Sequence, residues 1–194
     1  MAHHLWWVSH VIAGIPCEAY HGVMPRLRHY DSLNTARFVT FSCYRRHRYL
    51  ADRLSRDMVL EEITALRDVH KIKVLGYVVM PEHIHLVLHP PDDLELGRII
   101  GQFKARSARA ILSHCRQSRG QILVRPDGRP AVWHRRCYDH NCRTAEIVLE
   151  KIRYCHDNPV KRGLASRPED WPWSSYRWYH GRRNDVLEID GYEA

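Results

Sequence analysis

The alternation of hydrophobic and polar residues predicts three strands in the first half of the chain. Val39, Phe41 and Cys43 alternate with polar residues, which is the period-two pattern of a half-buried strand. A stretch rich in β-branched residues ends before Pro81, because proline cannot donate a hydrogen bond to a β-ladder. Since another apolar alternation follows at once, we expect an antiparallel hairpin. The expected strands are Arg37–Cys43, Lys71–Met80 and His83–His89.

Apolar residues at helical spacing predict three helices between and after these strands. The first begins at Ser55 and closes near His70, and the second covers Leu94 to Cys115 with a basic outer face. The third follows Thr144 and is expected to end near Asn158, because the next residue is a proline. Its buried residues would be Val148, Ile152 and Cys155.

A short strand is expected between the second and third helices, from Val132 to Asn141. The resulting order β, α, β, β, α, β, α suits an antiparallel sheet with helices packed on it, which is the α+β class. With 194 residues the chain is long enough for a single domain with a sizeable core. We expect this domain over residues 24–180, after a poorly structured extension at 1–23 and before a C-terminal tail at 181–194.

The net charge of the chain indicates the kind of partner that it binds. The chain has 30 Lys and Arg residues against 22 Asp and Glu residues, a net charge of +8, which favours a polyanion such as DNA. No acidic residue occurs from Leu96 to Pro126, so cations there are not neutralised by neighbours in the sequence. A solvated basic surface without a partner is the alternative. The candidate DNA-binding residues on the basic helix are Arg98, Lys104, Arg106, Arg109 and Arg116.

The six cysteines are scattered and do not form the tight framework of a small secreted protein, so we expect reduced thiols and a cytoplasmic location. No apolar stretch approaches the ~20 residues that span a bilayer, and no membrane association is expected. A zinc site is one alternative use of the Cys and His residues, although their spacing does not match common structural sites. Its ligands would be His134, Cys137, His140 and Cys142.

Two pairs of residues carry candidate chemistry. Alternation along the third strand directs Ile84 to one face and His83 and His85 together to the other, as two ligands of one metal ion require. Tyr154 and Asn158 are four residues apart and share one face of the last helix, so a hydroxyl and an amide oxygen can reach one site. The alternatives are an incidental His-x-His and a packing tyrosine.

These motifs together resemble the single-tyrosine HUH transposases of the insertion-sequence 200-like superfamily, and within it the REP-associated tyrosine transposases. The resemblance covers residues 24–179. It rests on the segments Met80–His85, Tyr154–Leu164 and Pro168–Tyr176, with the opening of the domain at Met24–Ser42.

The resemblance implies the ferredoxin-like HUH endonuclease fold, with the His-x-His strand in the middle of the sheet and the tyrosine helix beside it. It also implies that Tyr154 is the nucleophile, and that His83, His85 and Asn158 bind the metal. In many relatives the residue at position 158 is Gln. The substrate implied is single-stranded or hairpin DNA from repetitive extragenic palindromes.

The chemistry of these residues agrees with that role. A tyrosine hydroxyl has a pKa of about 10, so attack on a phosphodiester needs a cation that polarises the phosphate. Two imidazoles and one amide oxygen leave several coordination positions open, which fits Mg²⁺ or Mn²⁺ better than a closed zinc site. The product would be a 5′-phosphotyrosine. A DNA-binding regulatory protein of the same fold, without cleavage, remains the main alternative.

Overall fold

The sheet is the centre of the molecule, and the expected order of strands and helices is confirmed in a computed structural model that describes residues 35–92, 94–182 and 187–191. The extension at 1–23 lies outside the described residues. In chain order the elements are β1 (Ala36–Ser42), the short 3₁₀ segment η2 (Tyr44–Arg46), α2 (Arg53–His70), β2 (Lys73–Met80), β3 (His83–His89), α3 (Leu96–Gln117), β4 (Tyr138–Cys142), α4 (Ala145–Lys161), the 3₁₀ segment η3 (Pro168–Asp170) and α5 (Tyr176–Tyr179).

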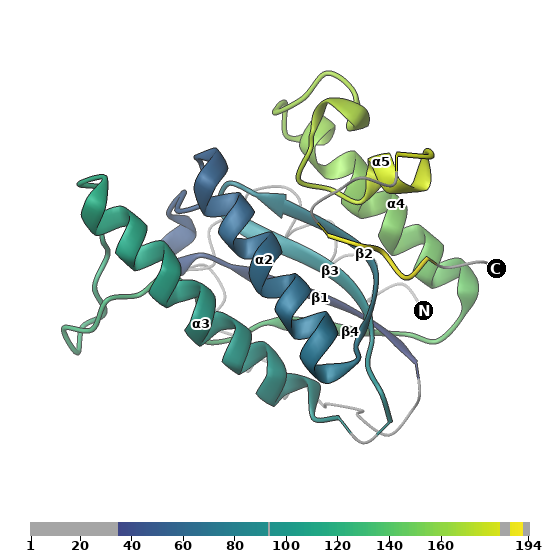
Figure 1. Cartoon of the computed structure of the whole chain (residues 1–194), viewed down its shortest axis with the longest axis horizontal. Coiled ribbons are helices and arrows are strands. Elements are labelled where there is room, and N and C mark those ends of the chain that lie inside the picture. Colours follow the sequence, from purple (N-terminus) through teal and green to yellow (C-terminus); the bar gives the residue numbers. More distant parts are fainter. Residues whose placement is uncertain (1–34, 93, 183–186, 192–194) are drawn as a thin grey trace, which may run out of the picture.

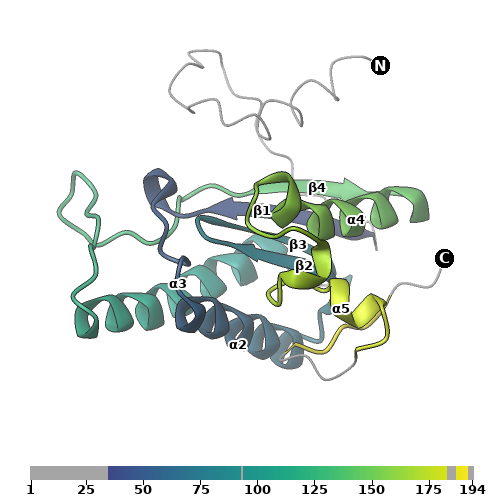
Figure 2. The same cartoon turned by 90° about the horizontal axis from the view of Figure 1, so that it is seen from above.

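All pairs in the sheet are antiparallel, and the strand order is β2-β3-β1-β4. Strand β3 is therefore flanked on both sides, as the family resemblance implied. Helices α2 and α3 lie together on one face of the sheet, and α4 lies on the other (Figures 1 and 2). The α+β class predicted from the sequence is correct.

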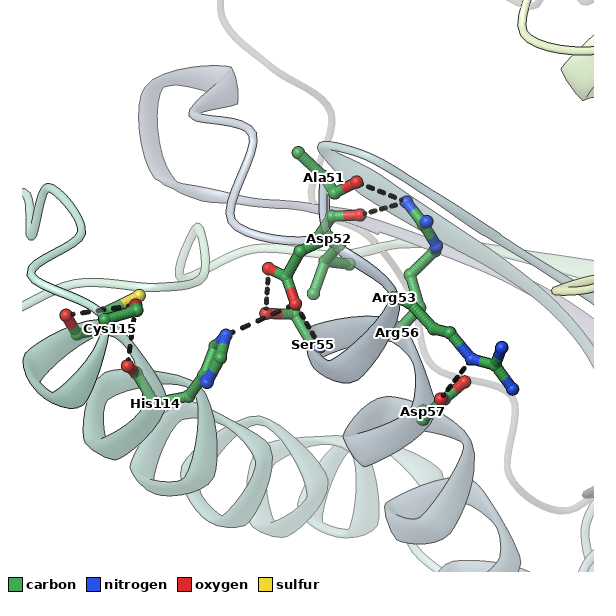
Figure 3. Close-up of polar contacts among 10 residues, drawn as sticks. Ala51, Asp52, Arg53, Ser55, Arg56, Asp57, His114 and Cys115 are labelled. Atoms are coloured by element: carbon green, nitrogen blue, oxygen red, sulfur yellow. Dashed lines mark hydrogen bonds and ion pairs between the residues drawn. The ribbon is translucent and has the colours of Figure 1, made fainter.

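Helix α2 starts earlier than the sequence indicated. Its N-cap is Asp52, whose carboxylate accepts hydrogen bonds from the backbone and the hydroxyl of Ser55 at 2.9 and 2.7 Å (Figure 3). An N-cap side chain satisfies one of the free N–H groups of the first turn, which an interior Ser55 cannot do. His114 of α3 lies 3.3 Å from the same carboxylate, so this cap also ties α2 to α3.

The strand expected from Val132 is shorter, because β4 begins only at Tyr138. Upstream, Trp133 forms one isolated bridge to Cys43. The carbonyl groups of residues 134–136 point at the ammonium group of Lys104, which donates to them at 3.2 to 3.5 Å. The Lys104 ammonium group thus takes the place of a neighbouring strand as the hydrogen-bond donor to these carbonyl groups.

Helix α4 runs through Pro159 to Lys161, so the expected end near Asn158 is wrong. A proline inside a helix costs about 3 kcal/mol because it cannot donate to the preceding turn. The next backbone groups restore the ladder, since Arg162 N–H donates to the Asn158 carbonyl at 3.1 Å. The helix ends at Lys161 with Arg162 as its C-cap, and Gly163 follows with a φ of +65°, the left-handed conformation common after a helix.

The C-terminal segment belongs to the domain further than the sequence indicated. Residues 181–194 were expected to form a tail, whereas Leu187 and Ile189 are buried in the core beside α2 and α3. The Asp190 carboxylate accepts hydrogen bonds from Arg67 and from the backbone of Val74. The boundary of the folded unit therefore extends past residue 180.

The tryptophans of the C-terminal motif pack and do not form an open platform. The Trp171 indole is buried and donates to the Val79 carbonyl at 3.1 Å, and the Trp173 indole donates to Asp57 at 2.8 Å. The Arg56 guanidinium lies 3.7 Å from the centre of the Trp173 ring. This segment thereby covers the β2 edge of the sheet, where the Trp173 carbonyl accepts from the Val79 N–H.

Helix α4 approaches β2 closely at a glycine. A Cβ atom at Gly76 would lie 3.0 Å from Cγ1 of Ile152, which is closer than ordinary carbon–carbon contact. Gly76 also follows an irregularity in the β2–β3 register. The absence of a side chain at residue 76 therefore determines how near α4 lies to the sheet.

Candidate active site

The two histidines of β3 lie on the α4 face of the sheet, as the alternation predicted. Ile84 and Leu86 are buried in the apolar core under α2 and α3, and His83 and His85 face the opposite side. Both imidazoles are only 3% exposed, and their ring centres are 4.7 Å apart. One strand thus supplies core packing on one face and two ligand-type side chains on the other.

Each imidazole is held in place through its Nδ1 atom. His83 Nδ1 lies 3.0 Å from a carboxylate oxygen of Glu82, and His85 Nδ1 lies 2.7 Å from the hydroxyl of Thr40. An ionised carboxylate only accepts hydrogen bonds, so Nδ1 of His83 must carry its proton. These contacts direct the Nε2 atoms to the same pocket and leave them as the potential ligand atoms.

Both histidines are held in the neutral form that binds metals. Burial lowers the pKa of His83 more than its bond to Glu82 raises it. Burial also lowers the pKa of His85 well below its usual value, with further lowering by the charges of His83, Arg46 and Arg162. Burial alone would raise the pKa of Glu82, but its bond to His83 and the nearby positive charges lower it on balance.

Helix α4 brings Tyr154 and Asn158 to the same pocket. The ring of Tyr154 packs edge-on against His85 with centroids 5.1 Å apart, and against Phe38 at 5.8 Å. Burial raises the pKa of the Tyr154 hydroxyl, while a hydrogen bond with the Asn158 side chain and the charge of Arg162 oppose that rise. Both side chains line the pocket, so the hydroxyl and the amide lie at one site, as their spacing predicted.

Two buried polar atoms in this pocket have no partner among the described residues. They are Nε2 of His85 and Oδ1 of Asn158, and both belong to side chains that line the pocket. A buried polar atom without a hydrogen bond is costly, and such atoms often mark a missing ion or water. Imidazole nitrogen and amide oxygen suit a divalent cation, so the residues present fit Mg²⁺ or Mn²⁺.

Three cations complete the lining, and the sequence analysis did not assign them to the site. They are Arg46 at the end of η2, and Lys161 and Arg162 at the end of α4. Lys161 and Arg162 reach the pocket because α4 continues through Pro159, which places them seven and eight residues after Tyr154 on one face. Thr40 and Glu82, which orient the histidines, were also missed. The polar residue opposite His85 on β1 was the available signal for Thr40.

The basic residues predicted to bind DNA lie on the other side of the sheet. Their helix, α3, packs on the core face, so a strand from the pocket would reach it only around the sheet edge. Lys104 is occupied by backbone carbonyls, and Arg106 pairs with Glu62 of α2 at 2.9 Å. Arg98, Arg109 and Arg116 are exposed. The geometry does not bring this set together with Tyr154.

The alternative zinc cluster is not assembled. Among residues 35–92, 94–182 and 187–191, no three His, Cys, Asp or Glu side chains are grouped as metal ligands, a criterion that does not count the amide of Asn158. Within the same residues, no helix combines the length and the apolar character needed to cross a membrane.

The chain is similar to known proteins both in sequence and in fold. Residues 32–154 match the family model described as "Transposase IS200 like", so the match ends on the tyrosine. A "REP-associated tyrosine transposase" of Escherichia coli strain K12 is 24% identical over 120 residues, 61% of this chain and 63% of that protein. A Haemophilus influenzae protein, "Putative REP-associated tyrosine transposase", is 28% identical over 109 residues, 55% of this chain and 60% of the relative.

The chain thus matches less than two thirds of the length of either relative. Among solved structures, one of a REP-associated tyrosine transposase bound to a REP hairpin has a TM-score of 0.64 and 22% identity, covering 88% of this chain and 98% of that one. This likeness supports the fold.

Proposed function

Because the chain belongs to the IS200-like transposase family, we propose that it cleaves and rejoins single-stranded or hairpin DNA with Tyr154 as the nucleophile. The observation that carries this proposal is the convergence of Tyr154, His83, His85 and Asn158 on one pocket. A nucleophile beside a neutral ligand pair and orphaned acceptor atoms is the arrangement that metal-assisted phosphoryl transfer requires.

In the proposed step the Tyr154 hydroxyl oxygen attacks the phosphorus atom and loses its proton. A new bond forms between this oxygen and phosphorus, and the bond from phosphorus to the 3′ oxygen breaks. The 3′ oxygen takes up a proton, which leaves a 5′-phosphotyrosine and a free 3′-hydroxyl. Because the ester bond is conserved, attack by another 3′-hydroxyl rejoins the strand without ATP.

His83, His85 and Asn158 are the residues that would hold the cation, through two Nε2 atoms and one amide oxygen. A bound Mg²⁺ or Mn²⁺ supplies charge that polarises the phosphate and offsets the negative charge of the transition state. Glu82 and Thr40 orient the two imidazoles. The packing of Tyr154 against His85 holds the nucleophile next to that position, which removes much of the entropic cost of attack.

The DNA partner is proposed by analogy with the relatives. They are named REP-associated, and the solved structure of similar fold is bound to a REP hairpin, so we propose a palindromic hairpin with single-stranded flanks as the substrate. The exposed basic residues of α3 would contact DNA outside the pocket. A cytoplasmic location follows from a chromosomal substrate.

Tyr154→Phe tests this function, because it deletes one oxygen and leaves the packed ring in place. The probe is labelled hairpin DNA with randomised single-stranded flanks, incubated with Mn²⁺. We expect the variant to bind the probe like the wild type, since phosphate contacts come from Arg and Lys. Cleavage and the covalent protein–DNA adduct should both disappear.

Tyr138→Phe is the matched control, because Tyr138 also packs against Phe38 but does not line the pocket. Its cleavage and its adduct should be unchanged. Peptide mapping of the trapped adduct locates the nucleophile, and DNA attached at any other residue contradicts the assignment. Binding without an adduct in the wild type would identify a regulatory DNA-binding protein.

A further inference from the structure

The turn that follows β1 has an unusual sequence for its backbone conformation. Arg45 and Arg46 both have positive φ angles, 52° and 55°, and the His47 N–H donates to the Tyr44 carbonyl at 3.1 Å. Two successive positive φ angles closed by such a bond are the features of a type I′ turn, which strongly prefers Asn and Gly at these positions. Here both positions are arginine, whose Cβ makes the left-handed region unfavourable.

The surrounding structure holds this turn against that preference. Arg46 N–H donates to the Cys43 carbonyl at 3.0 Å, and Tyr44 N–H donates to the Val132 carbonyl at 2.7 Å. Cys43 N–H donates to the carbonyl of Glu82, the residue that orients His83. The strained turn is thus attached directly to the candidate active site. Backbone strain that neighbouring contacts maintain is typical of functional positions.

The two arginines of the turn have different surroundings. The Arg45 guanidinium lies 5.5 Å from the centre of the Tyr44 ring, outside the pocket. Arg46 lines the pocket beside the histidines and Tyr154. Of the three pocket cations, Lys161 pairs with Asp157 at 3.3 Å and Arg162 pairs with Glu82 at 3.8 Å. No carboxylate among the described residues lies within ion-pair distance of Arg46, and its charge acts on Glu82 only from further away.

We infer that Arg46 binds the phosphate of the scissile nucleotide, and that the strained turn exists to deliver its guanidinium to the pocket. This inference rests on the proposed function and assigns it a further catalytic residue. A guanidinium without a carboxylate partner can donate two parallel hydrogen bonds to phosphate oxygens. Charge developing on those oxygens would meet a positioned cation, with little reorganisation during the reaction.

Glycine substitution separates strain from chemistry, because glycine adopts positive φ freely. Arg45→Gly and Arg46→Gly relieve the same turn, but only Arg46→Gly removes a pocket cation. We expect both variants to melt at or above the wild-type temperature. Cleavage of the hairpin probe in Mn²⁺ should fall by about 100-fold in Arg46→Gly. In Arg45→Gly it should remain near the wild-type rate, and Arg46→Lys should retain part of the activity.

Two readouts do not depend on cleavage. Mn²⁺ affinity, measured by calorimetry, should not be lower in Arg46→Gly than in the wild type, because no metal ligand is changed and a positive charge beside the histidines is removed. The salt dependence of probe binding should flatten by about 0.7 in the log–log slope in Arg46→Gly, because the variant neutralises one phosphate fewer. An unchanged slope together with wild-type cleavage overturns the inference.

If Arg46→Gly melts several degrees below Arg45→Gly and binds DNA as the wild type does, then Arg46 is a structural residue. That result would also overturn the inference. Failure of the proposed function has a separate signature. If the wild type forms no adduct, the transposase proposal fails, and the binding slope still decides whether Arg46 contacts DNA.

Discussion

The two faces of the sheet differ in what they bury. On the α2 and α3 face, Ile84, Leu86 and Leu88 are fully enclosed by other apolar side chains. On the α4 face, the same strand buries two imidazoles beside a tyrosine and an amide, and two polar atoms there lack partners among the described residues. Burial of apolar side chains on the first face stabilises the fold. Burial of polar groups on the second face costs free energy, which the apolar burial offsets.

The difference shows how one strand serves both purposes. Because successive side chains of a strand point to opposite faces, the residues of β3 that face the core and those that face α4 can be chosen independently. Substitutions on the two faces should therefore have separable effects on stability and on chemistry.

The largest effect is expected for His83→Ala combined with His85→Ala. Divalent-metal-dependent cleavage should be abolished, because two of the three proposed ligand side chains are removed. The chain should still fold, because the core-facing row of Ile84, Leu86 and Leu88 is untouched. The free energy of unfolding should nevertheless decrease, since truncation of two buried imidazoles leaves a cavity and removes their contacts with Thr40 and Glu82. Urea unfolding and Mn²⁺ calorimetry measure the two outcomes. Cleavage that survives the double substitution would place the metal elsewhere.

Leu86→Ala is the counterpart on the core face and should have the reverse profile. Truncation of a fully buried leucine costs about 3 kcal/mol of stability through reduced apolar burial and a residual cavity. The protein that remains folded should bind Mn²⁺ and cleave as the wild type does. A weaker Mn²⁺ affinity in folded Leu86→Ala would show that the two faces are coupled.

The α4 face should also give the protein an acid-sensitive stability. His156 is buried against Ser175, and burial lowers its pKa to about 4. Below pH 6.5 the unfolded chain binds a proton that the folded chain does not, so stability falls as the pH decreases from 6.5 to about 4. A shift of this size corresponds to about 3 kcal/mol. Urea midpoints at about pH 7 and about pH 4.5 for wild type and His156→Asn measure it, and an equal decrease in both would assign the sensitivity to other groups.

Glu82→Gln should have a smaller effect that is confined to the metal. The amide can accept the His83 Nδ1 proton but carries no charge, which weakens the orientation and the basicity of that ligand. Residues that orient metal-binding histidines typically account for about 10- to 100-fold in affinity. Mn²⁺ titration should show this decrease with an unchanged melting temperature. An unaltered Mn²⁺ affinity would remove Glu82 from the site.

The smallest effect concerns the basic residues of α3. Arg106→Ala with Arg109→Ala should lower the affinity for hairpin DNA and reduce the salt slope by about 0.7 for each phosphate that is no longer neutralised. Cleavage of bound DNA should continue, because α3 lies across the sheet from Tyr154. An unchanged slope would show that DNA stays on the α4 face. Removal of the exposed Arg106–Glu62 pair should alter stability little.

The central elements of the fold and the main residues of the site were predictable from local patterns. Alternation alone directs His83 and His85 to one side, and helical spacing alone pairs Tyr154 with Asn158. The residues that hold them were not predicted. Thr40 contacts His85 from another strand, and no local pattern shows that the Glu82 side chain contacts its neighbour His83. Arg46 could not be assigned because a sequence of two arginines gives no sign of a positive-φ turn.

Pro159 produced the most consequential difference between expectation and structure. The preference against helix before proline is local, and the packing of the last turn of α4 overrides it. Asn158 and Pro159 are both buried there, so tertiary contacts hold the turn in helical form. The same override adds Lys161 and Arg162 to the pocket, whereas the sequence analysis expected the helix to end before them.

The missing side chain at Gly76 sets the distance between α4 and the sheet, and thereby the distance across the active site. Tyr154 is carried two residues after Ile152, the side chain that rests on this glycine, while the histidines are carried by the sheet itself. The distance from Tyr154 to the two histidines therefore depends on an apolar contact outside the pocket. Substitutions that change the volume of the side chain at residue 76 or 152 would alter this distance without changing any group that takes part in the chemistry.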